Sequence, residues 1–245
     1  MQEQLYDYLH AIEEKHWWFL ARKKIILKLI DLYHTRSENE QILDVGCGAG
    51  MMLKALLPER GTVWGLDKSE KALRYSKEKV PGARMILGSF PEDLPRDSFD
   101  IITVLDVLEH IDEDAKALAA LKGALAPDGI AVITVPAYQF LWTNHDLVNE
   151  HKRRYTAPEL KRKILDAGLT IEKISYYNTF LFLPVALSKF ANRFFFPQTQ
   201  SHFGATPPPQ WINRALETIF SLEKYLLPFL NFPFGVSVIA VVKRR

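Results

Sequence analysis

The sequence feature that most constrains the fold is an apolar run that ends in a glycine-rich turn, ILDVGCGAG at residues 42–50. The run predicts a short buried strand. Gly46, Gly48 and Gly50 predict a turn whose backbone can approach a ligand with no Cβ atoms in the way. A helix that begins after the turn would direct free backbone N–H groups toward the same point. The segment therefore predicts an α/β unit with a ligand at the turn, although a turn that binds nothing fits the same pattern.

The spacing of the glycines separates two classes of cofactor site. A dinucleotide site follows the pattern G-x-G-x-x-G, and Met51 occupies the position of its third glycine. Here Asp44 precedes glycines at alternate positions, which gives the pattern acidic-x-G-x-G-x-G. This pattern resembles the first motif of class I S-adenosylmethionine-dependent methyltransferases. The resemblance implies that Asp44 and the turn hold S-adenosyl-L-methionine, with Cys47 as a small space-filling residue inside the turn.

A second carboxylate follows the turn at the spacing of a ribose-binding residue. The segment TVWGLD at 62–67 predicts a strand that ends in Asp67. In nucleotide-binding α/β units, an acidic residue about 20 positions after the glycines accepts the ribose hydroxyls. We therefore expect Asp67, and Lys68 beside it, at the cofactor. The alternative is that Asp67 caps the next helix, but Ser69 can fill that role.

Two further segments extend the resemblance. GSFPEDLP at 88–95 resembles the segment that carries the adenine contacts in this family, with Phe90 placed to cover the ring face. Ser89 stands where many relatives have an acidic residue. VLDVLEHI at 104–111 resembles a run in the small-molecule methyltransferases often called type 11, and it implies that Leu105 and Asp106 lie beside the methionine end of the cofactor. Together the four motifs, in this order, indicate a methyltransferase far more strongly than any one of them.

Strand and helix patterns alternate along most of the chain, which predicts an α/β fold with a mostly parallel sheet and helices on both faces. The predicted strands cover residues 41–45, 62–67, 84–87, 100–105, 129–136, 170–177 and 235–242. The predicted helices cover residues 5–33 in one or two pieces, 50–57, 69–80, 112–126, 157–167, 180–196 and 211–229. The last strand is almost entirely apolar, so we expect it inside the sheet. The resemblance implies a Rossmann-like sheet of seven strands in which this last strand is antiparallel.

We divide the chain into three parts. Residues 1–36 are expected to form an N-terminal helical lid, 37–177 with 235–245 the cofactor-binding domain, and 178–234 a helical insertion. Insertions of this length are usually functional. The insertion has apolar segments at 180–187 and 194–196 and a polar face of Ser188, Lys189, Asn192 and Arg193. We favour packing against the sheet as the explanation, then a lid over an apolar pocket, then contact with a membrane surface; a dimer contact also fits.

A segment near the N-terminus, HWWFLAR at 16–22, carries groups suited to methyl transfer. Aromatic rings can hold a sulfonium by cation–π attraction, worth about 0.5–2 kcal/mol each. We expect Trp18 in the core, and Trp17 and Phe19 facing the acceptor. Arg22 either pairs with the cofactor carboxylate or is a surface residue.

A second such segment, residues 138–155, follows the fifth predicted strand. It resembles a W-x-x-H-D…H-x-R-R-Y run of bacterial relatives of the type 11 group. His145 and His151 are the first candidates for a catalytic base, with His110 third; for each one alone a structural hydrogen-bonding role is the favoured explanation, and the three together suggest one catalytic histidine. The candidates for acceptor binding are Trp142, Arg154 and Tyr155, with the arginine suited to an anionic group.

Composition argues against several other classes of protein. The net charge of +2 gives no broad cationic surface for nucleic acid. The one cysteine allows no internal disulfide, and no group of residues has the spacing usual for a metal site, so we expect no metal. The polar first residues predict no secretory signal, and no apolar run reaches the roughly 20 residues of a membrane span. We therefore expect a cytoplasmic protein, with peripheral contact as its one link to a membrane.

These observations predict an enzyme that transfers a methyl group from S-adenosyl-L-methionine to the oxygen or nitrogen of a small or lipid-linked acceptor and releases S-adenosyl-L-homocysteine. The reaction is an in-line displacement at a sulfonium carbon, so alignment matters more than acid chemistry. Two alternatives stay open. A methyltransferase-like fold can bind the cofactor without catalysis. An NAD-dependent oxidoreductase is disfavoured by Met51 and by the lack of a recognisable hydride-transfer constellation.

Overall fold

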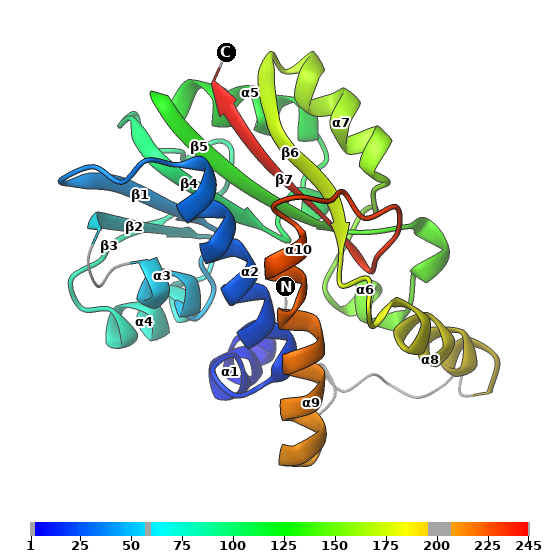
Figure 1. Cartoon of the computed structure of the whole chain (residues 1–245). Coiled ribbons are helices and arrows are strands. Elements are labelled where there is room, and N and C mark those ends of the chain that lie inside the picture. The colour runs from blue at the N-terminus through cyan, green and yellow to red at the C-terminus, as the bar shows by residue number, and fades with distance from the viewer. Residues whose placement is uncertain (1–2, 57–59, 196–206, 245) are drawn as a thin grey trace.

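The computed structural model describes residues 3–56, 60–195 and 207–244, without the side chains of residues 3–5 and 190–195. A seven-stranded sheet forms its centre, in the order β3-β2-β1-β4-β5-β7-β6 (Figure 1). β7 is antiparallel to β5 and β6, and the other neighbouring strands are parallel. The strands are β1 (Glu40–Val45), β2 (Gly61–Asp67), β3 (Arg84–Leu87), β4 (Phe99–Leu105), β5 (Leu125–Pro136), β6 (Leu169–Tyr177) and β7 (Ser237–Arg244). The predicted Rossmann-like sheet with an antiparallel last strand is confirmed.

Helices connect and cover these strands. The helices are α1 (Glu3–Ile12), α2 (Trp17–Tyr33), α3 (Met51–Leu56), α4 (Glu70–Lys79), α5 (Asp114–Ala124), α6 (Asn144–Val148), α7 (Ala157–Asp166), α8 (Phe182–Phe195), α9 (Gln210–Ser221) and α10 (Glu223–Leu226). Two short 3₁₀ turns are η2 (Leu108–His110) and η3 (Gln139–Leu141). The expected roles of Asn192 and Arg193 and of the side chains at 194–196 lie outside the described residues.

Some predicted boundaries are wrong. β7 runs to Arg244 because Lys243 and Arg244 still pair with β6, whereas the prediction ended where the apolar run ends. The predicted helix 211–229 is divided into α9 and α10. β5 begins at Leu125, where the prediction still had helix, since Leu125 already pairs with Phe99 of β4. Pairing with neighbouring strands decides where β5 begins and where β7 ends, and the local sequence pattern carries no signal for this pairing.

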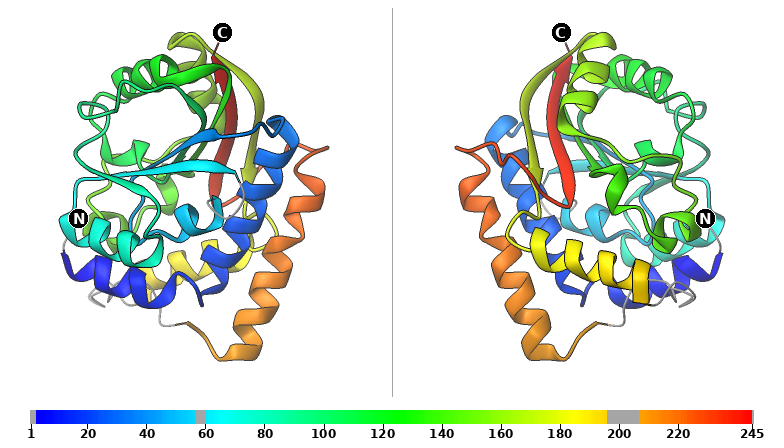
Figure 2. Two further views of the ribbon diagram at one scale, coloured as in Figure 1. Left: turned by 90° about the vertical axis from the view of Figure 1, so that its left-hand side faces the viewer. Right: turned by 90° about the vertical axis from the view of Figure 1, so that its right-hand side faces the viewer.

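Helices cover both faces of the sheet (Figure 2), and an apolar layer lies between the helices and the sheet on each face. Alternate residues of a strand face opposite sides. On one face Ile42 and Ile101 pack with α2, α3 and the buried residues of α9 and the segment after α10. On the other face Leu43 and Ile102 pack with α5 and α7. Each such fully buried side chain stabilises the fold by roughly 1.5–3 kcal/mol relative to an exposed one, so the two layers fix the sheet between its helices.

The N-terminal helices and the insertion pack against each other, although they are far apart in the sequence. α2 and α9 lie side by side (Figure 1). The Asn213 side chain accepts a hydrogen bond from the Trp17 backbone N–H (3.0 Å) and donates one to the Lys15 carbonyl (2.8 Å). The Trp17 and Phe220 rings meet edge to face, with centroids 6.1 Å apart. Both segments therefore support the same wall of the molecule.

Packing accounts for only part of the apolar surface of the insertion. Phe220 is fully buried, but Leu183, Leu187 and Trp211 are 68%, 67% and 73% exposed, and Phe229 is 84% exposed. The preferred explanation, packing against the sheet, therefore does not cover these side chains. Among the described helices, none combines the length and hydropathy required to cross a bilayer.

A buried carboxylate joins the insertion to the end of β6. Glu223 at the start of α10 has no exposed surface. Its side chain accepts hydrogen bonds from the backbone N–H groups of Asn178 (2.7 Å), Thr179 (2.6 Å) and Phe180 (3.0 Å). These three donors lie in the turn that leads into α8, so one side chain fixes both ends of the insertion.

The Glu223→Ala variant should be strongly destabilised. It leaves three backbone donors without their acceptor, and each charge-assisted bond is worth about 1.5–3 kcal/mol. We expect the free energy of unfolding in urea to fall by at least about 3 kcal/mol. Glu217→Ala on the neighbouring α9 removes an ion pair with the exposed Lys24, and it should change the free energy by no more than about 1 kcal/mol. Equal losses in the two variants would contradict the anchoring role.

Candidate functional site

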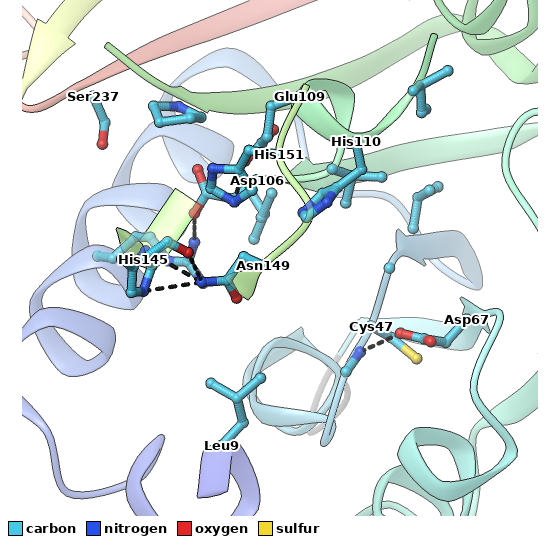
Figure 3. Close-up of a pocket in the computed structure, with 18 of the residues that line it drawn as sticks. Leu9, Cys47, Asp67, Asp106, Glu109, His110, His145, Asn149, His151 and Ser237 are labelled. Atoms are coloured by element: carbon cyan, nitrogen blue, oxygen red, sulfur yellow. Dashed lines mark hydrogen bonds and ion pairs between the residues drawn. The ribbon is translucent and has the colours of Figure 1, made fainter. Parts of the chain in front are cut away.

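A large cavity lies at the carboxyl ends of the parallel strands, where the sequence motifs meet (Figure 3). Its volume of about 1490 Å³ exceeds the roughly 300–1,000 Å³ typical of a site for one small molecule. The glycine turn after β1, the ends of β2 and β4, the loop after β5 and parts of α1, α2 and α8 form its walls. The cavity therefore has room for a cofactor and an acceptor together.

Almost all of the predicted site residues line this cavity. They are Trp17, Phe19, Arg22, Asp44, Gly46, Cys47, Gly48, Asp67, Lys68, Ser89, Phe90, Leu105, Asp106, His110, Trp142, His145, His151 and Arg154. Gly50 and Tyr155 do not line it. The fold thus brings together residues that the sequence places more than a hundred positions apart, as the motif order led us to expect.

The glycines of the turn have different reasons to be glycine. All three have positive φ, at 67° for Gly46, 55° for Gly48 and 90° for Gly50. A Cβ on Gly46 would lie 2.6 Å from Val107 Cγ2, and a Cβ on Gly50 would lie 2.9 Å from Ser76 Cα. A Cβ on Gly48 would meet no atom within 4 Å. Gly46 and Gly50 therefore permit close packing, and Gly48 leaves open space on the cavity side of the turn.

Asp67 ties the glycine turn to the start of α4. Its carboxylate accepts hydrogen bonds from the Gly48 N–H (3.0 Å) and the Ser69 N–H (2.9 Å). The Tyr6 hydroxyl donates a third, at 3.3 Å. Burial raises the pKa of Asp67. Ser69 caps α4 by accepting from the Ala72 N–H, so Asp67 is not needed as the side-chain cap, and Asp67 lines the cavity.

Asp44 and Cys47 lie deeper in the same wall. Asp44 is 3% exposed and accepts a 2.6 Å hydrogen bond from the Thr103 hydroxyl. Burial raises the pKa of Asp44 to about 7. Cys47 is buried, with its sulfur 3.8 Å from the Ser76 hydroxyl, and burial raises the pKa of its thiol. A buried thiol of raised pKa is a poor nucleophile, which agrees with a packing role for Cys47.

Arg22 and Asp106 form an ion pair across the cavity wall. Asp106 has a φ of 56° and also accepts a hydrogen bond from the Thr134 hydroxyl (3.1 Å). The Arg22 guanidinium lies 4.2 Å from the centroid of the Trp18 ring. Trp18 is partly buried and packs against the core, as expected, and it also lines the cavity. The two charges hold α2 against the end of β4, close to Asp44.

The rest of the predicted cofactor wall is more open. The loop with Ser89 and Phe90 is fixed by Asp93, whose carboxylate accepts from the Ser89 N–H (2.8 Å). Phe90 is half-buried and faces the cavity, while Lys68 is exposed at its rim. Asp93 thus contributes an acidic side chain to this loop, in which Ser89 occupies the position where many relatives have an acidic residue. The sequence motifs did not predict this contact.

Three histidines gather on the side of the cavity opposite Cys47 and Asp67 (Figure 3). The rings of His110 and His151 are 4.7 Å apart, and those of His145 and His151 are 6.3 Å apart. His151 Nδ1 lies 2.9 Å from the Asp146 carboxylate. Burial, together with the neighbouring His151, lowers the pKa of His110 to about 4. Burial, together with the nearby Lys189, lowers the pKa of His145 to about 4.

Arg154 and Tyr155 hold the loop that carries the histidines. Arg154 donates to both Asp146 oxygens (2.8 and 3.0 Å) and to the Ala137 carbonyl (3.0 Å). Its guanidinium is thus engaged with protein groups, which speaks against the predicted contact with an anionic acceptor. Tyr155 is fully buried and donates to Asp114 (2.9 Å). It lies outside the cavity, so its prediction as an acceptor-binding residue is wrong.

Tyr6, Glu109 and Lys189 are among the cavity residues that were not predicted as site residues. Tyr6 reaches Asp67 from α1, a helix that carries no motif. Glu109 is fully buried between the predicted Asp106 and His110, and burial raises its pKa well above the ordinary value. Lys189 of α8 lines the cavity, and burial lowers its pKa to about 8. Glu109 stands within the VLDVLEHI run, so its sequence position was the one available signal.

Known proteins place the chain in a family. A family model described as a methyltransferase domain matches residues 16–174, more than half of the chain. The chain belongs to this family, whose members are S-adenosylmethionine-dependent methyltransferases with the class I Rossmann-like fold. The match covers the glycine turn, Asp67 and the histidine loop, and it ends before the insertion.

Individual relatives are more distant. A Mycolicibacterium smegmatis protein named "Probable S-adenosylmethionine-dependent methyltransferase" is 24% identical over 66% of this chain and 63% of its own length. The ubiquinone biosynthesis O-methyltransferase of Thiobacillus denitrificans is 31% identical over 37% of this chain and 41% of its own length. The chain thus matches less than two thirds of the length of these relatives.

Solved structures resemble the chain over most of its length. An S-adenosylmethionine-dependent methyltransferase of Mesorhizobium loti has a TM-score of 0.61 at 16% identity, with 90% of this chain and 98% of that chain covered. A TehB-like methyltransferase of Corynebacterium glutamicum has a TM-score of 0.57 at 21% identity, with 91% and 88% covered. At these identities the likeness concerns the fold.

The raised pKa of Asp44 predicts a pH-dependent affinity for S-adenosyl-L-methionine. The free protein keeps a proton on Asp44 below about pH 7, whereas a cationic ligand group beside it favours the ionised form. Binding must then remove the proton, so the affinity should fall by up to about tenfold per pH unit below that value. Isothermal titration at about pH 6 and about pH 8 measures the effect. The Asp44→Asn variant should bind equally at both; an equally steep dependence there would refute the assignment.

Tyr155→Phe separates a structural role from a substrate role. The change removes the hydroxyl that donates to Asp114 and keeps the ring that packs in the core. We expect the free energy of unfolding to fall by about 1–3 kcal/mol, measured by urea denaturation, with no change in cofactor affinity. A variant of unaltered stability that binds its ligands poorly would restore the original interpretation.

Proposed function

We propose that the protein transfers a methyl group from S-adenosyl-L-methionine to a hydroxyl oxygen of a small acceptor that has an apolar part. The observation that carries the proposal is the continuity of one cavity from the glycine turn and Asp67 to the three histidines. A cofactor at the turn places its methyl group toward the histidine side. An acceptor in the other half of the cavity then lies in line with the bond that breaks.

The walls of the cavity suggest how the cofactor lies. Asp67 would receive the ribose hydroxyls, and Phe90 would cover the adenine. The methionine end would lie between the Asp44 carboxylate and the Arg22–Asp106 pair. Arg22 Nε is buried and has no hydrogen-bond partner among the described residues, so it can donate to the cofactor carboxylate while another nitrogen of the same group holds Asp106.

Methyl transfer forms one bond while another breaks. The acceptor oxygen attacks the methyl carbon, and the sulfur leaves with the electron pair of the C–S bond, which removes its positive charge. Alignment can supply roughly 7–11 kcal/mol of the rate enhancement. We propose that His145 takes the hydroxyl proton, because its exposed side chain lines the acceptor side of the cavity. A hydroxyl acceptor requires such a base, whereas a neutral amine does not.

Two observations support an apolar acceptor. Val185 and Lys189 of α8 line the cavity, while Leu183 and Leu187 of the same helix are exposed. α8 is thus a wall with the cavity on one side and an apolar surface on the other, where a tail or a membrane surface can be accommodated. In addition, several partial relatives are named ubiquinone biosynthesis O-methyltransferases, which supports a phenolic hydroxyl with a lipid tail as the first acceptor to test.

The alternatives are a fold that binds the cofactor without catalysis and an NAD-dependent oxidoreductase. Met51 is buried at the position of the third glycine of a dinucleotide turn. Isothermal titration with S-adenosyl-L-methionine and with NAD separates the cofactors. Transfer of a labelled methyl group to catechols with and without a prenyl tail, with and without anionic vesicles, then tests catalysis. Cofactor binding with no methyl transfer to any hydroxyl acceptor would favour the non-catalytic alternative.

The Asp67→Ala variant should bind S-adenosyl-L-methionine more than about tenfold more weakly, because two ribose hydrogen bonds to a carboxylate are each worth about 1.5–3 kcal/mol. Thermal unfolding reports whether the turn survives the loss of the Gly48 contact. Asp128→Ala changes an exposed residue near the amino-terminal end of β5, outside the cavity; it is the matched control and should bind normally. Unchanged affinity in Asp67→Ala would overturn the ribose assignment.

A further inference from the structure

Glu109, His110 and His151 form a compact group on the acceptor side of the cavity (Figure 3). One ligand atom from each lies within 4.8 Å of the others. Glu109 and His110 come from η2 after β4, and His151 comes from the loop after α6. At zinc bond lengths of about 2.0–2.2 Å, two ligand atoms of one ion lie roughly 3–4 Å apart. Small side-chain rotations therefore suffice to place all three around one ion.

Glu109 lacks the partners that a buried carboxylate requires. It has no exposed surface, and neither of its carboxylate oxygens has a hydrogen-bond partner among the described residues. The His151 Nε2 atom lies 4.0 Å from Glu109 Oε1, beyond hydrogen-bond distance. A buried polar group without partners is costly and calls for a specific explanation. A cation between Glu109 and the two imidazoles would supply the missing interaction.

The residues around His151 already have the arrangement of a metal site. His151 Nδ1 faces the Asp146 carboxylate at 2.9 Å, and Arg154 holds both oxygens of Asp146. A proton on Nδ1 leaves Nε2 with a free lone pair, and that nitrogen is the one near Glu109. Carboxylates that orient a histidine through its second nitrogen are typical of metal ligands. This contact fixes the ring in the orientation that a metal ion needs.

We propose that Glu109, His110 and His151 bind one divalent transition-metal ion. Two imidazoles and one carboxylate suit Zn²⁺, Fe²⁺, Co²⁺ or Mn²⁺, whereas Mg²⁺ and Ca²⁺ prefer sites made only of oxygen. Three protein ligands leave positions open, and all three residues line the cavity. The prediction from sequence spacing that the chain has no metal site missed this group, because His151 is far from the other two in the sequence.

The open positions face the place where an acceptor hydroxyl would lie, and this step rests on the proposed function. An ion there would hold the acceptor oxygen and lower the pKa of its hydroxyl. The proton passes to His145, the oxygen forms its bond to the methyl carbon, and the sulfur leaves with the electron pair. No oxidant or reductant takes part, so the ion acts as a Lewis acid.

Metal binding can be tested without cofactor or acceptor. Protein freed of metal by a chelator is titrated with Zn²⁺ in competition with a chromophoric chelator, and Co²⁺ is added separately to record its visible absorption. We expect one ion per chain with micromolar affinity or better. His110→Ala and His151→Ala should each bind Zn²⁺ at least about tenfold more weakly, and Glu109→Gln should do the same. Far-ultraviolet circular dichroism checks the fold, and if Glu109→Gln fails to fold the two histidine variants decide the matter.

His145→Gln is the matched control, since His145 lines the same cavity but does not belong to the group. It should bind Zn²⁺ as the unaltered protein does. Absence of stoichiometric binding, or equal affinity in all variants, would overturn the site. Metal binding without methyl transfer would count against the proposed function and support the metal site. Methyl transfer by protein that binds no metal would support the proposed function and overturn the metal site.

Discussion

The parallel pairing of β1 with β2 on one side and β4 on the other is the constraint on which the site depends. Val45 pairs with Leu66 and with Val104. The three strands therefore end at the same level, and the glycine turn, Asp67 and Asp106 emerge at one edge. Each of these residues follows directly from a strand, so a shift of register in either pairing would separate them by several ångströms. The site is rigid because it belongs to the core of the sheet.

The acceptor side of the cavity is held in place mainly by ion pairs and hydrogen bonds to buried carboxylates, and less by the pairing of strands. Asp146 receives Arg154 and His151, while Asp114 receives Tyr155, Arg153 and Lys163. Breaking a buried, hydrogen-bonded ion pair typically costs 3–5 kcal/mol. Arg154 and Tyr155, which the sequence suggested for acceptor binding, thus mainly hold the loop in its conformation. The histidines and Glu109 project from this framework into the cavity.

The sheet and the direction of its strands could be predicted from the sequence, and almost every residue predicted at the cofactor lines the cavity, because each motif follows a strand whose pattern is local. The sequence could not predict Tyr6, which reaches Asp67 from a helix without any motif. It misassigned Tyr155 because a loop pattern does not reveal which side chains turn inward. The grouping of His151 with Glu109 depends on the path of the loop after β5. The side-chain contacts of Asp146 with other residues of this loop set that path.

The carboxylates that line the cavity differ in the hydrogen bonds and ion pairs that the protein provides to them. Asp67 accepts three hydrogen bonds, Asp106 has Arg22 and Thr134, and Asp44 has Thr103. Glu109 is as deeply buried as any of them and has no hydrogen-bond partner in the described chain. A protonated glutamic acid would still bury an unpaired donor, which the same principle disfavours. His151 Nε2 lies 4.0 Å from Glu109 Oε1, too far for a proton on Glu109 to form a hydrogen bond without side-chain movement, whereas a cation between the carboxylate and the two imidazoles would interact with all three groups at once.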